Sequence, residues 1–501
     1  MIESKQLEAL LFSFNIGAST AENDPLLEVA KIETQQFHDL YYQDRIDIVK
    51  GIKGAGKTAL YRLLYFLNKF LIKNKNLYCV FGVEASGDPV FRLYQKEFED
   101  YSEIEFENFW NIYFIALVYN LVYTTKELKE KLQQDLPKVD KILSDVGLKF
   151  TKSGFSLKDS INAIQKILRS IKIKVAVKTD LDPATALIKS VSPLIELEPR
   201  QIEEISVRPI YVAGFRDLLT EIISKHGIKI WVMLDRLDEV FPHRSEVEKT
   251  GLRGLLKASY NFSHPNLRIK IFLRDDIIGY LAAEGFTALT HVTDRCSSTM
   301  SWSKDELLYL IMKRILSLDP FMKYYGIDKD LIDNQKEYRE KLFYTIFPKK
   351  IGKTSTMDWI YANCADSNNI VTPRDIIDFF NSAKAEQLKQ YKLNPKDQEH
   401  LIQPEIFKKA LEELSRHKKD TFLFAEFPHL KEQFLKFEGN QSEYDQASLV
   451  DLIGTNQLKV IDDLKSIGFL RYIPKSSTYK VPVIWRKGLN IRRAKKLALK
   501  E

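Results

Sequence analysis

The chain has 501 residues, 45% hydrophobic and 29% charged, which is the composition of a soluble protein of about two to four domains. Its 20 glycines and 17 prolines are too few for a disordered chain, and three cysteines with no CxxC pair exclude a disulfide scaffold and suit the reducing cytoplasm. The net charge of +7 is concentrated at one end, because the residues from 459 onward include twelve basic and three acidic side chains and the other 458 sum to −2.

Strands and helices alternate in the predicted elements of residues 1–300. A short strand at 45–49 leads into a glycine-rich turn and a helix of regularly spaced leucines, and a buried strand follows at 77–83. The apolar runs 228–234 and 267–273 predict two further buried strands. This alternation predicts an α/β fold, with a parallel sheet and helices on both faces.

The lysine-rich stretch 126–209 is expected to be a helical insertion in this fold, with one strand at 171–177. A single long helix is expected at 106–132. It includes the uncharged run 108–125, whose three asparagines and helical spacing favour a buried core helix over a membrane span. No signal peptide is expected at the start of the chain.

The second part of the chain predicts helices and a small β-element. Helices at 303–318 and 373–391 indicate a helical lid over 301–400. A last domain over 401–501 is predicted from two helices and the two strands of a hairpin, at 445–454, 456–467, 469–473 and 479–485. Two helices joined by a turn and followed by a two-stranded wing make a winged helix.

The turn after the first strand, GIKGAGKT, fits the Walker A pattern GxxxxGK[ST] in full. Its glycines allow backbone N–H groups to cradle phosphates, while Lys57 reaches the β- and γ-phosphates and the Thr58 hydroxyl ligates Mg²⁺. The expected nucleotide contacts are Gly51, Gly54, Ala55, Gly56, Lys57, Thr58 and Ala59. Asp47 is unusual in the preceding strand, because central parallel strands are apolar. A second GKT at 352–354 is not a phosphate loop, since Phe347 stands where the first glycine belongs.

A carboxylate that could hold the magnesium follows the apolar run IWVML, where Asp235 ends a predicted strand. Asp238 or Glu239 would orient or deprotonate the attacking water, and the sequence leaves the choice between them open. Arg274 ends the next strand and is a candidate γ-phosphate sensor, the alternative being an ordinary pair with an aspartate. Arg374 begins a predicted lid helix and could reach phosphate, the alternative being a solvated surface arginine.

Taken together, the runs VKGIKGAGKTAL, WVMLDRLDEVF, IKIFLRDDI, SWSKDELLYLIMKR and TPRDIIDFFNSA resemble a group of bacterial P-loop ATPases. This group stands near the STAND NTPases and the origin-recognition class of AAA+ proteins. The resemblance covers about 15–390, apart from the insertion, and extends to the winged helix. It implies that Lys57 and Thr58 are the Walker A pair and that Asp235 is the Walker B aspartate. By the same resemblance, Arg274 is the sensor that follows the fourth strand and Arg374 is the sensor of the lid domain.

The resemblance has one departure. Most AAA+ enzymes place a glutamate directly after the Walker B aspartate, whereas Arg236 follows Asp235 here. That is closer to the STAND pattern, leaves the identity of the catalytic base open and allows slow, switch-like hydrolysis. The sequence does not assign an arginine finger that acts on a neighbouring copy. Three arginines are candidates, Arg244, Arg253 and Arg295, and for each the alternative is an ordinary surface arginine.

The basic C-terminal end is a candidate nucleic-acid surface. The expected phosphate contacts are Lys459, Arg486, Lys487, Arg492, Arg493, Lys495 and Lys496. A solvated tail is the alternative, and Asp462 and Asp463 on the second helix would repel phosphates. The resemblance implies that such a winged helix often regulates the ATPase or packs against a partner.

The sequence therefore predicts a cytoplasmic, Mg²⁺-dependent ATPase that acts as a nucleotide-driven, homo-oligomeric switch on an effector or sensor protein or on double-stranded DNA. ATP is preferred over GTP because no NKxD element follows the strand of Asp235. The resemblance alone adds a role in defence against phage. The alternatives are an ATP-licensed DNA-binding initiator that uses the winged helix, and an idle nucleotide-binding scaffold, against which the intact Lys57, Thr58 and Asp235 argue.

Overall fold

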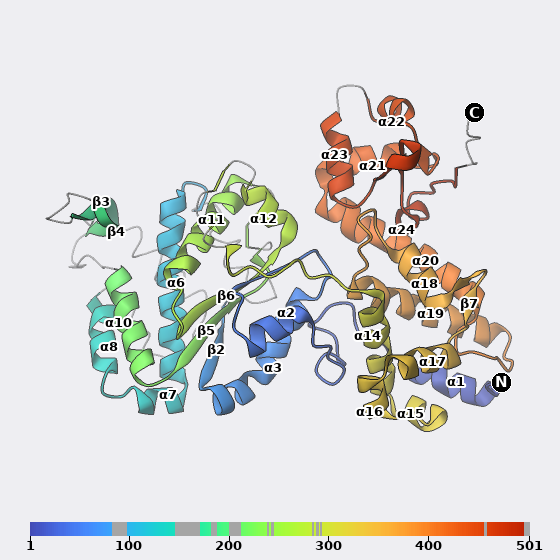
Figure 1. Cartoon of the computed structure of the whole chain (residues 1–501), viewed down its shortest axis with the longest axis horizontal. Helices are drawn as coiled ribbons and strands as arrows, with labels where there is room; N and C mark the ends of the chain where they lie inside the picture. The colour runs from blue at the N-terminus through green and yellow to red at the C-terminus, as the bar shows by residue number, and fades with distance from the viewer. Residues whose placement is uncertain are drawn as a thin grey trace. The chain divides into compact units, whose positions relative to one another are not determined.

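The structure is a computed structural model that describes residues 1–82, 98–145, 171–181, 188–199, 212–237, 240–241, 245–282, 285–286, 290, 293–454 and 458–494. The chain divides into two compact units (Figure 1). The helical unit consists of Met1–Glu33, Lys53–Gly56 and Ser301–Glu501, and the sheet unit consists of Thr34–Ile52 and Lys57–Met300.

The sheet unit is built on four parallel strands in the order β1-β6-β5-β2. They are β1 (Ile48–Gly51), β2 (Leu77–Phe81), β5 (Lys229–Leu234) and β6 (Leu267–Arg274). Residues 295–300 extend the sheet on the other side of β1, where Ser297 donates its N–H to the Ile48 carbonyl at 2.8 Å and Met300 to the Lys50 carbonyl at 2.8 Å. β6 therefore separates the strand of the phosphate loop from the strand of Asp235.

Helices cover both faces of this sheet, as predicted. The described helices of the unit are α2 (Gln35–Phe37), α3 (Lys57–Lys75), α6 (Glu103–Thr124), α7 (Lys126–Lys131), α8 (Leu136–Asp145), α10 (Val212–Lys225), α11 (Glu246–Asn261) and α12 (Asp275–Ala282), with a π-helical turn at His38–Tyr42. On one face, Tyr61 of α3 packs edge-on against Phe81 and Phe272. Consecutive strand residues point to opposite faces, and Val80 and Leu273 join α6 and α11 in a core on the other face.

α6 is the buried helix expected from the uncharged run, and nearly all its residues from Phe106 to Tyr119 lie in the core. No helix in the described part of the chain is long and apolar enough to cross a membrane. The single helix predicted at 106–132 is wrong, because the backbone is extended at Thr125 and a separate helix, α7, follows. The break falls where the apolar run gives way to the charged sequence KELKEK.

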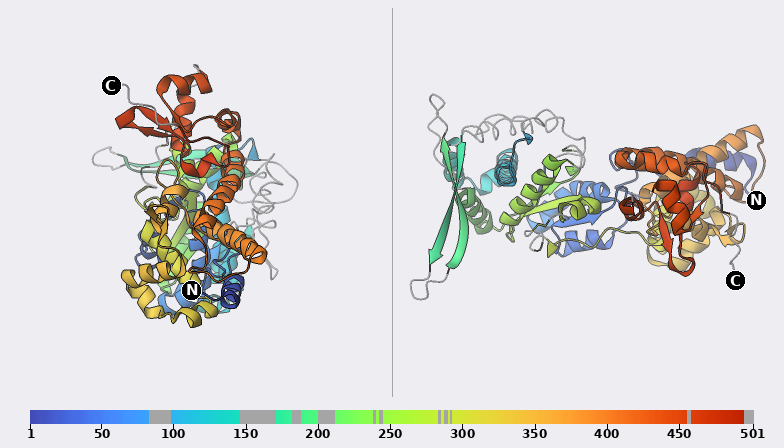
Figure 2. Two further views of the ribbon diagram at one scale, coloured as in Figure 1. Left: turned by 90° about the vertical axis from the view of Figure 1, so that its right-hand side faces the viewer. Right: turned by 90° about the horizontal axis from the view of Figure 1, so that it is seen from above.

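The stretch 126–209 is less helical than the predicted helical insertion with one strand. It contains α7 and α8, and also β3 (Ile171–Leu181) and β4 (Ile188–Pro199), which pair with each other as an antiparallel ribbon (Figure 2). The single strand predicted at 171–177 is thus one arm of a longer hairpin. The period-two pattern IKIKVAVK is typical of a strand, whereas its partner contains two prolines and gives a weak strand signal.

A charge cluster at the start of β1 accounts for Asp47. Lys270 of β6 is fully buried, and its ammonium donates to Asp47 Oδ1 at 2.7 Å and to Asp44 Oδ1 at 2.5 Å. Arg295 and Arg268 pair with Asp47 at 2.5 and 3.1 Å. Burial alone would raise the pKa of Asp47, but Lys270 and Arg295 outweigh it and hold that pKa below its ordinary value. The strand predicted at 45–49 begins only at Ile48, so Asp47 lies just before β1, and its partly buried carboxylate is tolerated there because cations surround it.

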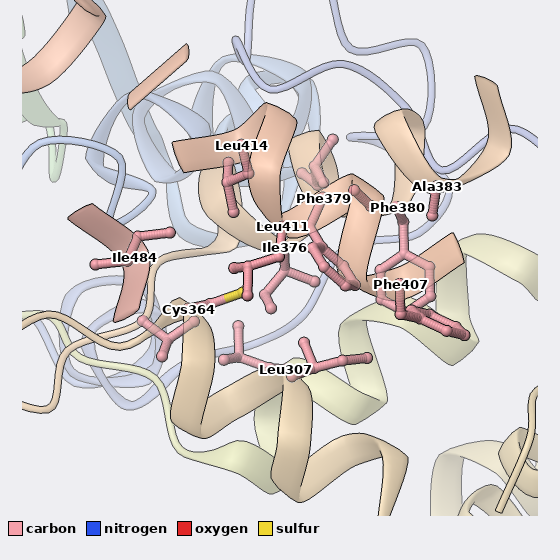
Figure 3. Packing of buried hydrophobic residues seen from close by; sticks show 14 of the residues in the cluster. Leu307, Cys364, Ile376, Phe379, Phe380, Ala383, Phe407, Leu411, Leu414 and Ile484 are labelled. Atoms are coloured by element: carbon pink, nitrogen blue, oxygen red, sulfur yellow. The ribbon is translucent and has the colours of Figure 1, made fainter. Parts of the chain in front are cut away.

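The helical unit has one continuous hydrophobic core. Its helices before residue 437 are α1 (Ser4–Ser13), α14 (Lys304–Leu316), α15 (Asp319–Tyr325), α16 (Lys329–Asn334), α17 (Lys336–Ile346), α18 (Thr356–Cys364), α19 (Pro373–Leu393), α20 (Pro404–Lys418) and α21 (Lys431–Lys436), with a small hairpin of β7 (Lys350–Ile351) and β8 (Thr354–Ser355) and a π-helical turn at Lys419–Phe424. Figure 3 shows Ile484, from the C-terminal part, in the same cluster as Cys364 and Leu414. The domain boundary predicted at residue 400 stays a prediction, because one hydrophobic core includes residues from both sides of this position.

Residues 443–494 form what we call the C-terminal module. Its elements are β9 (Glu443–Tyr444), α22 (Gln446–Ile453), α23 (Leu458–Ser466), β10 (Arg471–Ile473), β11 (Thr478–Lys480) and α24 (Val483–Arg486), and its three strands pair in the order β10-β11-β9. The two helices and the hairpin occur in the predicted order. The second strand, predicted to reach residue 485, ends at Lys480, because Pro482 has no N–H for the ladder and caps α24 instead.

Candidate nucleotide-binding site

The phosphate loop connects the end of β1 to the start of α3. Gly54 and Gly56 have φ of 85° and 104°, a left-handed conformation that glycine adopts without strain. α3 begins at Lys57, so the N–H groups of Lys57, Thr58 and Ala59 belong to the first turn of a 19-residue helix and point out of its N-terminal end. A helix start of this kind attracts phosphate.

Lys57 turns back over the loop. Its Nζ donates to the carbonyl oxygens of Gly51 and Ile52 at 2.8 and 3.0 Å. The ammonium is thus held above the loop, where a lysine can move onto a phosphate oxygen by exchanging hydrogen-bond partners. Thr58 is half-buried at the second position of α3.

Asp235 directly follows β5 and is 2% exposed. The chain turns sharply after it, because Arg236 has φ of 56°, which is strained for a residue other than glycine. The turn ends the strand and leaves Asp235 at the carboxyl edge of the sheet. Asp238 and Glu239 lie outside the described residues, so the choice of base between them stays open.

Arg274 ends β6, and in the parallel register it lies opposite Gly51, the first residue of the loop. Its guanidinium is buried and makes a bidentate pair with Asp276, with two N–O distances of 3.0 Å. The ordinary arginine–aspartate pair considered from the sequence is therefore present. A sensor role for Arg274 stays a prediction, and it would require exchange of this carboxylate for phosphate.

The tip of the loop, Lys53–Gly56, belongs to the helical unit and makes specific contacts there. Lys53 forms an ion pair with Glu426, and Trp302 donates its Nε1–H to the Ala55 carbonyl at 2.8 Å. No sequence motif predicts that Trp302 or Glu426 contacts the loop, because each contact depends on how distant parts of the chain pack. A tryptophan just before the N-cap of a helix carries no sequence signal of such a role.

Gly54 is predicted to be the least replaceable residue of the loop tip. A Cβ placed on it would lie 3.1 Å from Thr372 Oγ1 and 3.2 Å from Arg374 Cβ, in addition to the positive φ. We expect Gly54→Ala to weaken ATP binding at least about tenfold, because the free loop would relax to relieve about 1–2 kcal/mol of left-handed strain and ATP binding would have to restore it. Gly352→Ala is the matched control, with φ of 64° but open space around it. Calorimetric titration with ATP checks both, and equal losses would contradict the role of the crowded tip.

Arg374 lies in the first turn of α19, directly after Pro373. It is half-buried, and its Nε–H donates to the Ser19 carbonyl at 3.3 Å, so it is not a freely solvated side chain. One turn later, burial raises the pKa of Asp378, with the hydroxyl of Ser19 acting against the shift. The structure thus places Arg374 beside Gly54 of the loop tip and beside Ser19, and all three residues belong to the helical unit.

The candidates for an arginine finger are bound within their own unit where they are described. Arg253 donates to the carbonyls of Leu281 and Gly285 at 2.7 and 3.0 Å, and Arg295 pairs with Asp47. Arg244 lies outside the described residues.

Thr58 and Asp235 offer a hydroxyl and a carboxylate, the hard oxygen donors that Mg²⁺ prefers. In the described part of the chain no three His, Cys, Asp or Glu side chains gather to hold a metal by themselves. This donor set suits a Mg²⁺ ion that takes few protein ligands and completes its shell with water and nucleotide phosphate.

The predicted nucleic-acid residues divide into two groups. Arg486 is half-buried and donates to the Val481 carbonyl at 2.9 Å, and Lys487 pairs with Glu412 at 2.7 Å, so both already have partners within the chain. Lys459, Arg492 and Arg493 are exposed, as is the paired Lys487. Residues 495 and 496 lie outside the described residues.

The sheet order and the loop define a P-loop nucleoside-triphosphate-binding fold of the α/β class. No known family model and no curated protein matches the chain. One similar solved structure is the Walker-type ATPase PABY2304 of Pyrococcus abyssi, with 11% identity and a TM-score of 0.38; the match covers 95% of this chain and 98% of that one. Another is the Aeropyrum pernix ORC2 protein in ADPNP–ADP complexes, with 11% identity and a TM-score of 0.36; the match covers 92% of each chain. At these values the assignment rests on the site itself.

Proposed function

We propose that this protein binds and hydrolyses ATP with Mg²⁺ and works as a nucleotide-driven switch. The observation that carries the proposal is the arrangement at one edge of the parallel sheet. The phosphate loop follows β1, Arg274 ends β6, and Asp235 follows β5. The groups proposed to bind phosphate, sense the γ-phosphate and hold Mg²⁺ thus come from three adjacent strands. Ligands of open α/β sheets bind at this carboxyl edge.

Each residue then has a chemical task. The loop amides and Lys57 bind the β- and γ-phosphates, while Thr58 and Asp235 hold Mg²⁺, which neutralises charge on the phosphates when it is bound. Asp238 or Glu239 orients the attacking water and takes its proton. Arg274 and Arg374 report the presence of the γ-phosphate, the first after leaving Asp276.

We further propose that nucleotide state controls assembly into a homo-oligomer and the action of the protein on an effector or sensor protein, in the cytoplasm. The resemblance noted above suggests anti-phage defence as the setting. Steady-state phosphate release from ATP, with and without duplex DNA, tests the core of the proposal. Absence of turnover, or turnover that needs neither Mg²⁺ nor Lys57, would overturn it.

The second candidate is an ATP-licensed DNA-binding initiator or regulator, in which the C-terminal module is a winged helix. The order of α22, α23, β10 and β11 favours it, as does the exposure of Lys459, Arg492 and Arg493. The acidic residues of α23 count against the usual mode, in which the second helix enters the major groove. The basic segment after α24 is the better phosphate contact.

This candidate predicts that Arg492→Ala/Arg493→Ala weakens binding to duplex DNA. Each arginine that contacts phosphate contributes about 1 to the slope of log affinity against log salt, so the slope should fall by about 2. The matched control is Lys408→Ala/Lys409→Ala, an exposed basic pair on α20. Fluorescence anisotropy with labelled duplex at several salt concentrations measures both. Equal effects of the two double variants would leave the basic segment without a special role.

A further inference from the structure

The first turn of α19, which carries Arg374, is fixed by a buried carboxylate. Asp375 is 5% exposed and completes a capping box: its N–H bonds to Thr372 Oγ1 at 3.2 Å, and its carboxylate accepts the Thr372 N–H at 3.3 Å. Arg374 lies between these two residues. The position of its backbone therefore depends on where the Asp375 carboxylate is held.

That carboxylate is held from outside α19, by Lys418 at the end of α20. Lys418 Nζ donates to Asp375 Oδ2 at 2.7 Å, and both side chains are largely buried, at 12% and 6% exposed. A buried aspartate that lost its lysine would turn towards water and leave the cap unmade.

Lys418 in turn contacts the C-terminal module. Its ammonium lies over the rings of Trp485 and Phe422, at 5.2 and 5.7 Å from the ring centres, and these two rings stack at 5.8 Å. Trp485 belongs to α24, is fully buried and donates Nε1–H to the Gly468 carbonyl at 2.9 Å. The Lys418 ammonium is therefore held in place by the Asp375 carboxylate and by the faces of two aromatic rings.

A second connection runs parallel to the first. The turn before α19 docks on the module: Ser367 donates its N–H to the Gly468 carbonyl at 3.0 Å, and Arg471 of β10 donates to Asn369 at 3.0 Å. Gly468 is thus the acceptor for both routes. The N-terminus of α19 is connected to the module on two sides.

We propose that Lys418 is a positioning residue for Arg374, through which the C-terminal module sets the rate of ATP hydrolysis. The inference rests on the proposed ATPase function. A ligand that shifts the module moves Trp485, hence Lys418 and Asp375, and displaces Arg374 from the loop tip. The relay passes only through packed or hydrogen-bonded groups of one unit.

The test uses the whole chain, five variants and one matched control. Lys418→Met removes the ammonium and keeps the apolar stem, Lys418→Arg restores the charge, and Asp375→Asn/Lys418→Met removes both charges so that none is buried alone. Arg374→Ala, alone and with Lys418→Met, completes a double-mutant cycle. Lys336→Met is the matched control, because its pair with Asp305 at 2.5 Å joins α17 to α14 in the same unit without touching Asp375.

Lys418→Met should lower kcat for ATP by about tenfold to a hundredfold with KM changed less than about twofold, and Lys418→Arg should restore most of the rate. The double variant with Arg374→Ala should be no slower than Arg374→Ala alone. A further slowing by the same factor, or a normal kcat in Lys418→Met and in the charge-free pair, would overturn the inference.

Hydrogen exchange at the amides of Thr372, Asp375 and Ile376, which are bonded within the cap, gives a readout that does not need turnover. Lys418→Met should speed exchange there at least about tenfold, and Lys336→Met should not. If the wild-type chain fails to hydrolyse ATP, the proposed function fails, yet this measurement still decides the coupling. Unchanged exchange in Lys418→Met would reject it.

Discussion

Replacing Lys57 by alanine is expected to lower ATP hydrolysis by at least about a hundredfold, whereas replacing Lys353 should leave it unchanged. Both lysines stand in a Gly-Lys-Thr sequence. Lys57 lies over the phosphate loop, bonded to the Gly51 and Ile52 carbonyls, while Lys353 is exposed in the turn between β7 and β8. Loss of a preorganised positive donor at a transferring phosphate lowers kcat by about 10²–10³.

Phosphate release and the binding of a fluorescent ATP analogue separate the two steps of this prediction. Lys57→Ala should lower the rate of phosphate release and also weaken binding of the analogue, because the lysine ammonium contacts phosphate in the bound state as well as during hydrolysis. Asp235→Asn should keep most nucleotide binding and lose turnover, since the amide is a poorer ligand for Mg²⁺ at an unchanged shape. If Lys353→Ala lowered turnover as much as Lys57→Ala, the assignment of the loop would be wrong.

The core of the site could be predicted because its signal is local. Eight consecutive residues contain the phosphate loop, and the left-handed φ of Gly54 and Gly56 is what their spacing requires. Asp235 and Arg274 each end an apolar run, so their place at one sheet edge follows from the α/β rhythm. The order of the strands did not follow, because pairing between distant strands leaves no mark on either one.

The contacts around the loop tip were beyond prediction for the same reason. Trp302 and Glu426 meet the loop through packing of segments some 250 or more residues away along the chain. Lys418 looks like one of many surface lysines until α19 and α24 are in place. The hairpin in the insertion was missed because Pro193 and Pro199 weaken the strand pattern of β4.

Asp47 shows how an exception in the sequence can point to a network. An acidic residue at the start of a buried strand is costly unless cations surround it, and Lys270, Arg268 and Arg295 come from elements more than 200 residues later. Lys270 in turn stands in the run LRIKIFL, where a buried lysine is equally exceptional. These two exceptional residues, one just before β1 and the other within the neighbouring strand β6, are partners of each other.

Lys270→Met is accordingly expected to destabilise the sheet unit by about 3 kcal/mol, the lower end of the range for breaking a buried ion pair, because Asp47 keeps two arginines. The methionine fills the volume of the stem, so the loss is that of the ammonium. Hydrogen exchange at the amides of β6 measures the sheet unit by itself, and exchange should become about a hundredfold faster. Lys304→Met, which breaks the exposed pair with Asp358, should change stability by less than about 1 kcal/mol.

The pH dependence separates this charge pair from simple packing. The pKa of Asp47 is below its ordinary value in the folded chain, so its contribution is fully present above the unfolded pKa, near 4, and is lost as pH falls through the folded value. The difference between wild type and Lys270→Met should therefore be constant at neutral pH and shrink below about pH 4. Adding Asp47→Asn to Lys270→Met should recover part of the loss. A difference that persists unchanged in acid would mean that Lys270 stabilises β6 through its stem, against Trp231, and not through Asp47.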